Sequence, residues 1–377
     1  MSSPAPATTR VETCGLSPLS CFLRDMSIAN QVRGEATIAE IRQQPDTWRE
    51  TFRRAKAASL GKLPAAVITG AGTSAYAAMA LEAAWPGARA VPSTELFLHF
   101  ESFLDGIGLV VSLARSGDSP ESVAVVDKIR RGRPGVRHLA LTPNAQGRLA
   151  NWPGVEVVVL DPRSNDRSLV MTSSFTNLVL CGCALARPAE VEAALPALCD
   201  GAAAVIDKHA ETARQLAGNP PARLAALASF PLSGAARETC LKVLEMTAGR
   251  IATLAETYLG LRHGPMSFID PETVVLCFLS SDPRLRRYEM DLVNELRSKR
   301  IGRLLALAPP DAEAGTFDLA ITHAASSLED YLRTPAEIVF PQLLAYHYSL
   351  RFGIDPDSPS PGGVIHRVVQ GVRIYED

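Results

Sequence analysis

The chain has 377 residues, which at about 150 residues per domain predicts two domains or one large duplicated unit. Its 38 Lys and Arg residues nearly balance 40 Asp and Glu residues, and neither sign gathers in a long run. This distribution argues against binding to nucleic acid or to an anionic membrane surface. The longest apolar stretches, such as 178–186, are also far shorter than the roughly 20 residues of a membrane span. We therefore expect no nucleic-acid and no membrane partner, and a small-molecule partner instead.

Residues 1–25 are rich in Ser, Pro, Thr and Ala and lack the basic start and apolar stretch of a secretory signal, which predicts a disordered leader. Residues 26–60 are predicted to form a helical segment. The seven cysteines are scattered, with no C-x-x-C pair and no histidine at zinc-ligand spacing. This pattern predicts a reducing, cytoplasmic location and no bound metal.

From residue 65 onward, short β-branched runs alternate with helical patterns, as is typical of parallel α/β sheets. A mainly helical stretch over 174–216 interrupts the alternation, which then restarts and ends in one long C-terminal helix. The predicted strands are 65–69, 88–91, 108–114, 136–142 and 155–160 in the first half, and 223–229, 250–257, 272–280, 303–308 and 317–322 in the second. We expect an α/β protein of two tandem lobes, each a doubly wound parallel sheet flanked by helices. The expected boundaries are 61–190 for the first lobe, 191–218 for a helical connector, 219–355 for the second lobe and 356–377 for a tail that enters the active site.

The two lobes resemble each other in sequence order. The segments VVSLARSGDSPES, from Val110, and VVLCFLSSDPRLR, from Val274, both run from a strand through a Ser-rich turn and a proline into a helix. In the first copy the two strand-to-helix turns, 70–74 and 115–119, contain glycine, whereas their counterparts in the second copy contain none. Only a turn without side chains lets backbone N–H groups approach an anion closely. The first lobe is therefore predicted to bind a phosphate, and the second is not.

The segment GAGTS, residues 70–74, stands where a strand gives way to a helix, so unpaired N–H groups and the helix dipole favour a negative charge there. Gly72 opens the turn, and the hydroxyls of Thr73 and Ser74 add hydrogen-bond donors. Two other interpretations remain open at this point. The pattern G-x-G-x-x-A, with Glu95 near the end of the next strand, also fits a dinucleotide-binding fold, and an αβ turn without any ligand is equally ordinary.

The second turn supplies the hydroxyls of Ser116, Ser119 and Ser122 beside the guanidinium of Arg115. Such chemistry has no place in a dinucleotide fingerprint, and two hydroxyl-rich turns could converge on one monophosphate. Ser and Gly also favour plain turns and helix caps, so either turn alone is only weakly specific.

A third group of residues points to proton transfer. Lys242 and Glu245 stand three residues apart and share one face of a predicted helix, which is also the spacing of a structural ion pair. Further on, Glu256 precedes His263, which is placed between Arg262 and a Gly-Pro turn instead of on an apolar face.

These motifs together resemble the SIS sugar-isomerase family. They are GAGTS, ARSGDSPES, NDRSLVMTSSFTN, AARETCLKVLEMTAG, LRHGPMSFID and the tail HRVVQGV. The similarity runs from about Thr37 to the C-terminus and is greatest to the tagatose-6-phosphate ketose/aldose isomerase branch, also described as galactosamine-6-phosphate deaminase/isomerase. The resemblance implies two SIS domains, a hexose 6-phosphate or amino-hexose 6-phosphate as substrate, and a homodimer or larger homo-oligomer with shared active sites.

The resemblance also implies roles for individual residues. The catalytic set would be Glu245 as proton carrier, Lys242 beside it, His263 as the ring-opening group contributed by an adjoining subunit, and Arg367. The substrate-binding set would be Gly72, Thr73, Ser74, Arg115, Ser116, Ser119, Thr172, Ser173, Glu256 and His366. Related synthases carry a Schiff-base lysine in the tail, where this sequence has His366 and Arg367. A guanidinium cannot form an imine, so no covalent anchor is expected in the tail.

The function that we expect is deamination and isomerisation of an amino-hexose 6-phosphate, with galactosamine 6-phosphate as the favoured substrate and no cofactor. General acid and base catalysis by a carboxylate can supply this chemistry. The alternatives are a simple ketose/aldose phosphate isomerase, a glucosamine-6-phosphate deaminase or aminotransferase-like enzyme, and a catalytically silent sugar-phosphate sensor. A nicotinamide enzyme is a further possibility, which the absence of dinucleotide binding would remove.

Overall fold

The computed structural model describes residues 33–58, 60–61 and 63–375. The chain divides into a short N-terminal unit, residues 1–33, and a main unit, residues 34–377, which holds the fold. The leader predicted over residues 1–25 lies outside the described residues.

The main unit contains two five-stranded sheets, and all strand pairs within them are parallel. The first sheet consists of β1 (Ala66–Gly70), β2 (Arg89–Pro92), β3 (Leu109–Leu113), β4 (Arg137–Thr142) and β5 (Glu156–Val159). The second consists of β6 (Arg223–Ala228), β7 (Ala252–Glu256), β8 (Val274–Phe278), β9 (Arg303–Leu307) and β10 (Leu319–Ile321). The strand orders, β2-β1-β3-β4-β5 and β7-β6-β8-β9-β10, are the same topology repeated. The predicted α/β class with two doubly wound sheets is confirmed.

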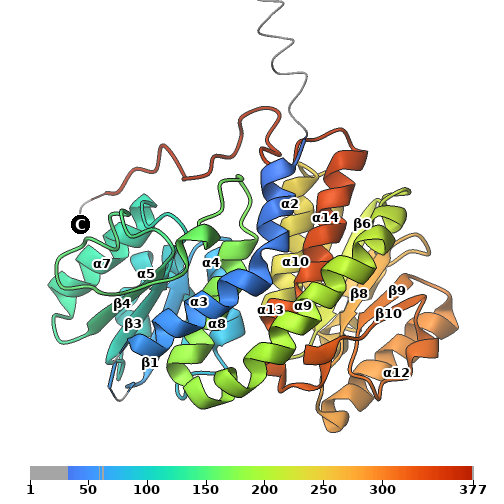
Figure 1. The fold of residues 1–377 in the computed structure, drawn as a ribbon, viewed down its shortest axis with the longest axis horizontal. Helices are drawn as coiled ribbons and strands as arrows, with labels where there is room; N and C mark the ends of the chain where they lie inside the picture. Colours follow the sequence, from blue (N-terminus) through green and yellow to red (C-terminus); the bar gives the residue numbers. More distant parts are fainter. Residues whose placement is uncertain (1–32, 59, 62, 376–377) are drawn as a thin grey trace, which may run out of the picture. The chain divides into compact units, whose positions relative to one another are not determined.

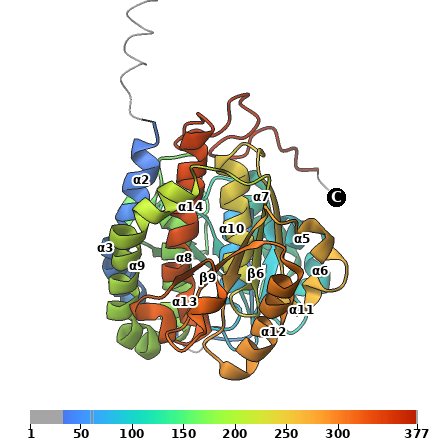
Figure 2. The ribbon, with the colours of Figure 1, turned by 90° about the vertical axis from the view of Figure 1, so that its right-hand side faces the viewer.

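Helices cover both faces of each sheet. Their bounds are α2 (Glu35–Arg42), α3 (Gln44–Ala57), α4 (Thr73–Leu81), α5 (Ser93–Leu98), α6 (Phe100–Phe103), α7 (Pro120–Gly132), α8 (Ser173–Ala186), α9 (Pro188–Leu216), α10 (Ser233–Met246), α11 (Tyr258–Leu261), α12 (Pro283–Lys299), α13 (Asp330–Glu337) and α14 (Val339–Arg351). Figure 1 shows α9, α10 and α14 between the two sheets. In Figure 2, α3 and α9 run along one side, while α5, α6, α11 and α12 lie on the other.

Each strand divides its side chains between two cores, because successive residues of a strand point to opposite faces. In β8, Val274, Leu276 and Phe278 join a large core shared with the first sheet and the central helices. Val275 and Cys277 join a separate core under α12. Since residues of both sheets meet in the large core, the two lobes pack as one body.

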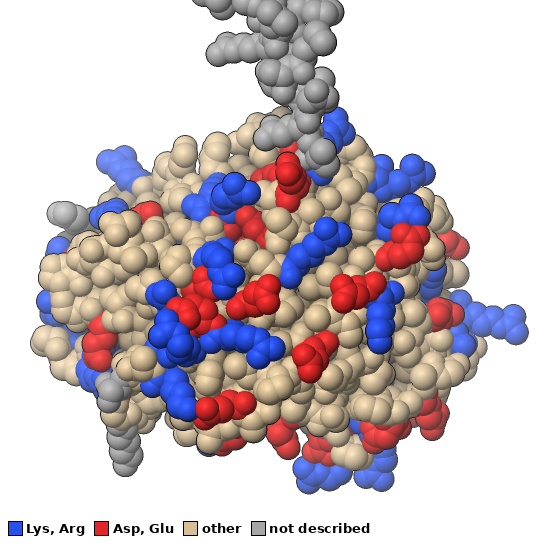
Figure 3. Space-filling model, in the orientation of Figure 1, with Lys and Arg blue, Asp and Glu red and all other residues tan. Residues whose placement is uncertain are grey.

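The single long C-terminal helix that the sequence predicts is instead two helices, α13 and α14, separated at Ile338. Pro341, in the first turn of α14, has no N–H to donate to the carbonyl of Glu337, so the hydrogen-bond ladder breaks there. Among the described helices none is both long and apolar enough to cross a membrane. Figure 3 shows basic and acidic side chains interspersed over one face, as the balanced composition predicts.

Candidate active site

A cavity of about 350 Å³ lies at the carboxyl ends of β1 and β3, the neighbouring strands at which the strand order of the first sheet reverses. Ligands of open α/β sheets bind at such switch points. Five parts of the chain line the cavity: the turn after β1, the turn after β3, the helix α10, the loop before α8 and the tail. The residues of the predicted site that line it are Gly72, Thr73, Ser74, Arg115, Ser116, Ser119, Glu245, His366 and Arg367.

The turn after β1 brings the first turn of α4 to the edge of this cavity. A side chain on Gly70 would put its Cβ 2.6 Å from the Cβ of Ser74, so only glycine lets the helix pack this closely on the strand. Gly72, at φ +55° and ψ −127°, is the N-cap of α4, in a backbone conformation that favours glycine. The turn geometry therefore requires the glycines that the sequence shows.

At this cavity, the helices α4 and α7 have N-termini without a side-chain cap. Neither the N-cap Gly72 of α4 nor the N-cap Ser119 of α7 makes a side-chain capping hydrogen bond. The first N–H groups of a helix have no partner within the helix, and the helix dipole makes this end attractive to anions. With the hydroxyls of Thr73, Ser74 and Ser116 beside them, the two N-termini form a cradle suited to a phosphate.

In the second lobe, carboxylate side chains of the protein accept the hydrogen bonds of the turn that corresponds to the turn after β3. The bond from Leu279 N to Leu307 O matches that from Ala114 N to Leu141 O, which aligns Ser280 with the position of Arg115. The carboxylates that fill this place are Glu289, which accepts from Ser280 N at 2.8 Å, Asp330, which accepts from Ser281 N at 2.8 Å, and Asp282, which caps α12 through Arg284 N at 2.8 Å. Three carboxylates therefore occupy the donors that an incoming anion would need.

The helix α10 carries a group of three ionisable side chains. Lys242 Nζ lies 2.5 Å from Glu245 Oε2 and 3.5 Å from Glu238 Oε1, and the lysine and Glu238 are fully buried. The hydroxyl of Thr73 lies 3.3 Å from Glu238 Oε1, which joins the group to the phosphate cradle. Glu238 was missed in the sequence, although it stands one helical turn before Lys242 on the same face.

Burial determines the charge of this group. It raises the pKa of Glu238 to about 8, since the attraction of Lys242 only partly offsets desolvation. Burial by itself would lower the pKa of Lys242, but the two carboxylates outweigh it and the pKa is raised. At neutral pH, Glu238 is therefore protonated, and the charged lysine pairs with Glu245, whose carboxylate reaches the cavity.

Two arginines of the predicted site direct their hydrogen bonds to oxygen atoms of the protein. The guanidinium of Arg115 donates to the carbonyls of Ser168, Leu169 and Arg367, and that of Arg367 donates to Asp166 O and Asn165 Oδ1. Both arginines line the cavity, but these hydrogen bonds all go to oxygen atoms of the protein.

Thr172 and Ser173 do not line the cavity; both are fully buried. Their backbone N–H groups donate to the carboxylate of Asp166, which takes the place of an anion at the start of α8. Their neighbours Leu169 and Met171 reach the cavity instead. The polar motif around Thr172 therefore anchors the start of α8, and the sugar contact expected of Thr172 and Ser173 stays a prediction.

His263 and Glu256 also lie apart from the cavity. His263 is exposed in the turn after α11, and Glu256, at the end of β7, accepts a hydrogen bond from Thr257 N at 2.7 Å. Within one chain, then, the structure does not bring the predicted ring-opening histidine to Glu245.

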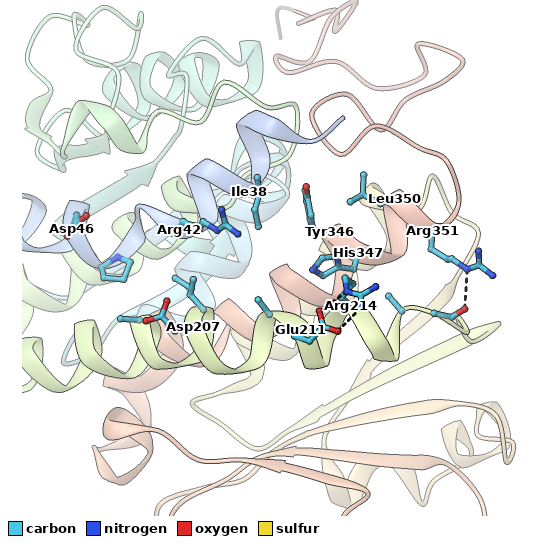
Figure 4. A pocket seen from close by; sticks show the side chains of 16 residues that line it. Ile38, Arg42, Asp46, Asp207, Glu211, Arg214, Tyr346, His347, Leu350 and Arg351 are labelled. Atoms are coloured by element: carbon cyan, nitrogen blue, oxygen red, sulfur yellow. Dashed lines mark hydrogen bonds and ion pairs between the residues drawn. The ribbon is translucent and has the colours of Figure 1, made fainter. Parts of the chain in front are cut away.

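A larger hollow, of about 1280 Å³, lies between α2, α9 and α14 (Figure 4). Its charged side chains include Arg214, which pairs with Glu211 at 2.6 Å, and Arg351, which donates to Gly218 O. None of the predicted site residues lines it.

The fold and the cavity define a tandem SIS protein of the phosphosugar isomerase class. Tagatose-6-phosphate ketose/aldose isomerase from Escherichia coli has this arrangement, with 31% identity, a TM-score of 0.79, and coverage of 88% of this chain and 97% of that one. The C-terminal domain of glucosamine-fructose-6-phosphate aminotransferase from Francisella tularensis shares the fold at 16% identity, with a TM-score of 0.73 over 86% of this chain and 98% of that one. The strand order is not that of the dinucleotide-binding Rossmann fold, and Glu95 is exposed on α5.

The chain belongs to the AgaS family. D-Galactosamine-6-phosphate deaminase AgaS from Shewanella sp. is 35% identical over 363 residues, 90% of this chain and 91% of that one. The protein of the same name from Escherichia coli O157:H7 is 34% identical, over 82% of this chain and 84% of that one. No family model matches the sequence.

Proposed function

We propose that the chain is an amino-hexose-6-phosphate deaminase/isomerase that converts galactosamine 6-phosphate and water into tagatose 6-phosphate and ammonia. The observation that carries the proposal is one cavity that holds both an anion cradle, made by α4 and α7, and the carboxylate of Glu245. The AgaS relatives are named for deamination of this amino sugar, and their similarity spans most of the chain.

In this proposal the 6-phosphate binds at the first turns of α4 and α7, through Thr73, Ser74, Ser116 and Ser119. Phosphate binding places the other end of the sugar toward Glu245. Its carboxylate removes the C2 proton of the open-chain aldehyde and returns it to C1, while a proton passes from the amine nitrogen to O1. The amino aldehyde thereby becomes a C2 imine with a hydroxymethyl group at C1. Water then adds to C2 and ammonia leaves, which completes the ketose.

Lys242 holds Glu245 in position in this reaction, because its Nζ lies 2.5 Å from Glu245 Oε2. The carboxylate of Glu245 is the group that accepts the proton. The carbonyl at C1 makes the neighbouring C2–H bond acidic. Removal of this proton by a positioned general base accelerates the reaction by about 10²- to 10⁴-fold.

We further propose that a second copy of the chain supplies His263 as the ring-opening group. The histidine is exposed and absent from the cavity of its own chain, and Leu244, next to Glu245 in sequence, leaves 43% of its surface exposed. Mixing His263→Ala and Glu245→Gln proteins, each inactive alone, tests this assembly. Recovery of activity on mixing supports a shared site, and no recovery after verified subunit exchange contradicts it.

The proposal includes a cytoplasmic location. The five described cysteines, Cys181, Cys183, Cys199, Cys240 and Cys277, are free and buried, which suits a reducing compartment.

Incubation with galactosamine 6-phosphate tests the function, with ammonia measured enzymatically and the ketose followed by proton NMR. Equal amounts of ammonia and tagatose 6-phosphate are expected. Ketose formation only from neutral hexose 6-phosphates would instead indicate a simple isomerase. Faster turnover of glucosamine 6-phosphate would reassign the substrate, and binding without any turnover would indicate a sensor.

A further inference from the structure

Arg115 holds three separated segments of the chain together. Its side chain, in a residue only 7% exposed, donates from Nη1 to Ser168 O at 3.1 Å and Leu169 O at 2.9 Å, and from Nη2 to Arg367 O at 2.7 Å. All three acceptors are backbone carbonyls. The planar fork of a guanidinium suits this geometry, because its donors point in fixed, divergent directions.

Arg367 completes the connection from the other side. While its carbonyl is held by Arg115, its own guanidinium donates to Asp166 O at 3.0 Å from Nε and to Asn165 Oδ1 at 2.7 Å from Nη2. The tail is thus held at this residue from both its backbone and its side chain, against the loop that precedes α8.

The tail is also fixed at its start, where Asp357 accepts hydrogen bonds from Thr37 N and Leu169 N. Beyond it, in the described residues 358–375, every hydrogen bond to the remainder of the chain runs through Arg367, apart from the turn bond from Ser358 N to Asp355 O. Figure 1 shows this segment passing back over the first lobe without regular secondary structure. Nevertheless Val364, Ile365, His366 and Gln370 line the cavity, so one anchored residue places both neighbouring parts of the tail over the sugar site.

We propose that Arg115 is a positioning residue that latches the C-terminal tail across the cavity, and that it is not itself a phosphate ligand. The inference deepens the proposed function, since the tail closes the same site and brings His366 to it. Its location fits this role: Arg115 directly precedes Ser116 of the phosphate cradle, so the turn that binds the phosphate also carries the latch. Burial lowers the pKa of Arg115 to about 10, which leaves the guanidinium charged in neutral solution.

The test compares Arg115→Lys with wild type, and uses Arg284→Lys as the control, because Arg284 is exposed and pairs only locally, with Asp282 at 2.8 Å. Lysine keeps the charge but cannot bridge carbonyls on two segments as the guanidinium does. The readouts are hydrogen–deuterium exchange of residues 358–375, the dissociation constant of inorganic phosphate, and kcat and KM for galactosamine 6-phosphate.

For Arg115→Lys, exchange in the tail should rise toward the rate of a free peptide of the same sequence, and kcat/KM should fall by about tenfold or more, while phosphate affinity changes less than about threefold. The control should match wild type in all three. A tenfold loss of phosphate affinity with unchanged tail exchange would make Arg115 a phosphate ligand and overturn the latch.

Arg367→Ala provides a second route that leaves the phosphate turn intact. It removes the hydrogen bonds to Asn165 and Asp166, so tail exchange should rise here as well; unchanged exchange would contradict the latch even if Arg115→Lys does not fold. Because tail exchange is measured without substrate, the latch and the proposed activity can fail independently.

Discussion

Replacing Glu238 by Gln should remove the contribution of this carboxyl to the pH dependence of stability between about pH 5 and pH 8. Glu238 is fully buried, and burial raises its pKa from 4.5 to about 8. Between these values the folded protein holds a proton that the unfolded chain has lost. The contribution of Glu238 to stability is therefore greatest below pH 4.5 and falls as the pH rises toward 8, by about 1.4 kcal/mol per pH unit.

The size of this contribution follows from the difference between the two pKa values. Across the whole range from pH 4.5 to pH 8 the loss reaches about 5 kcal/mol, and between pH 5.5 and 7.5 it is about 3 kcal/mol. Glutamine keeps the shape of the side chain and its ability to accept from Thr73, but carries no titrating proton. In the variant, the contribution of this residue to the change of the unfolding free energy with pH should therefore be lost.

Urea unfolding of wild type and Glu238→Gln at several pH values from 5.5 to 8.5 measures this difference. Glu50→Gln is a suitable control, because Glu50 is held by Arg53 and Arg54 with a pKa of about 2 and does not titrate in this range. Parallel slopes for wild type and Glu238→Gln would refute the assignment of a protonated carboxyl beside Lys242.

Three further outcomes are expected. Ser116→Ala should weaken sugar-phosphate binding by about tenfold, as loss of a charge-assisted hydrogen bond does, whereas the matched change Ser281→Ala in the second lobe should have no effect on isothermal titration; equal losses would place the anion elsewhere. Glu245→Gln should keep substrate binding but lose exchange of the C2 proton with solvent deuterium, and undiminished exchange by NMR would reassign the proton carrier. Borohydride added during turnover should leave every lysine unmodified in mass spectra, and a reduced sugar adduct would show that catalysis uses a Schiff base.

The sequence predicts the sheets well because their signal is local. Each buried strand is a short apolar run followed by a turn, and all ten predicted strands form within a few residues of their expected ends. The turn between β1 and α4 is predictable for the same reason, since Gly70 and Gly72 are required by the backbone of one short turn. The break between α13 and α14 also has a local cause, Pro341, although the sequence pattern predicts one continuous helix.

What could not be read from the sequence depends on contacts between distant residues. Arg115 looks like an anion ligand in its own turn, yet its guanidinium reaches Arg367, 252 positions away. Thr172 belongs to a polar motif, but Asp166 occupies its backbone N–H. Glu238 is one of many acids on amphipathic helices, and only its complete burial beside Lys242 sets it apart.

A crystal structure of the Glu245→Gln protein with galactosamine 6-phosphate tests the central claim most directly. The phosphate should lie at the N-termini of α4 and α7, in contact with Thr73, Ser74 and Ser116, and C1 and C2 should lie beside residue 245. A sugar phosphate bound instead at Ser281 of the second lobe, or in the hollow between α2, α9 and α14, would contradict the assignment of this cavity as the active site.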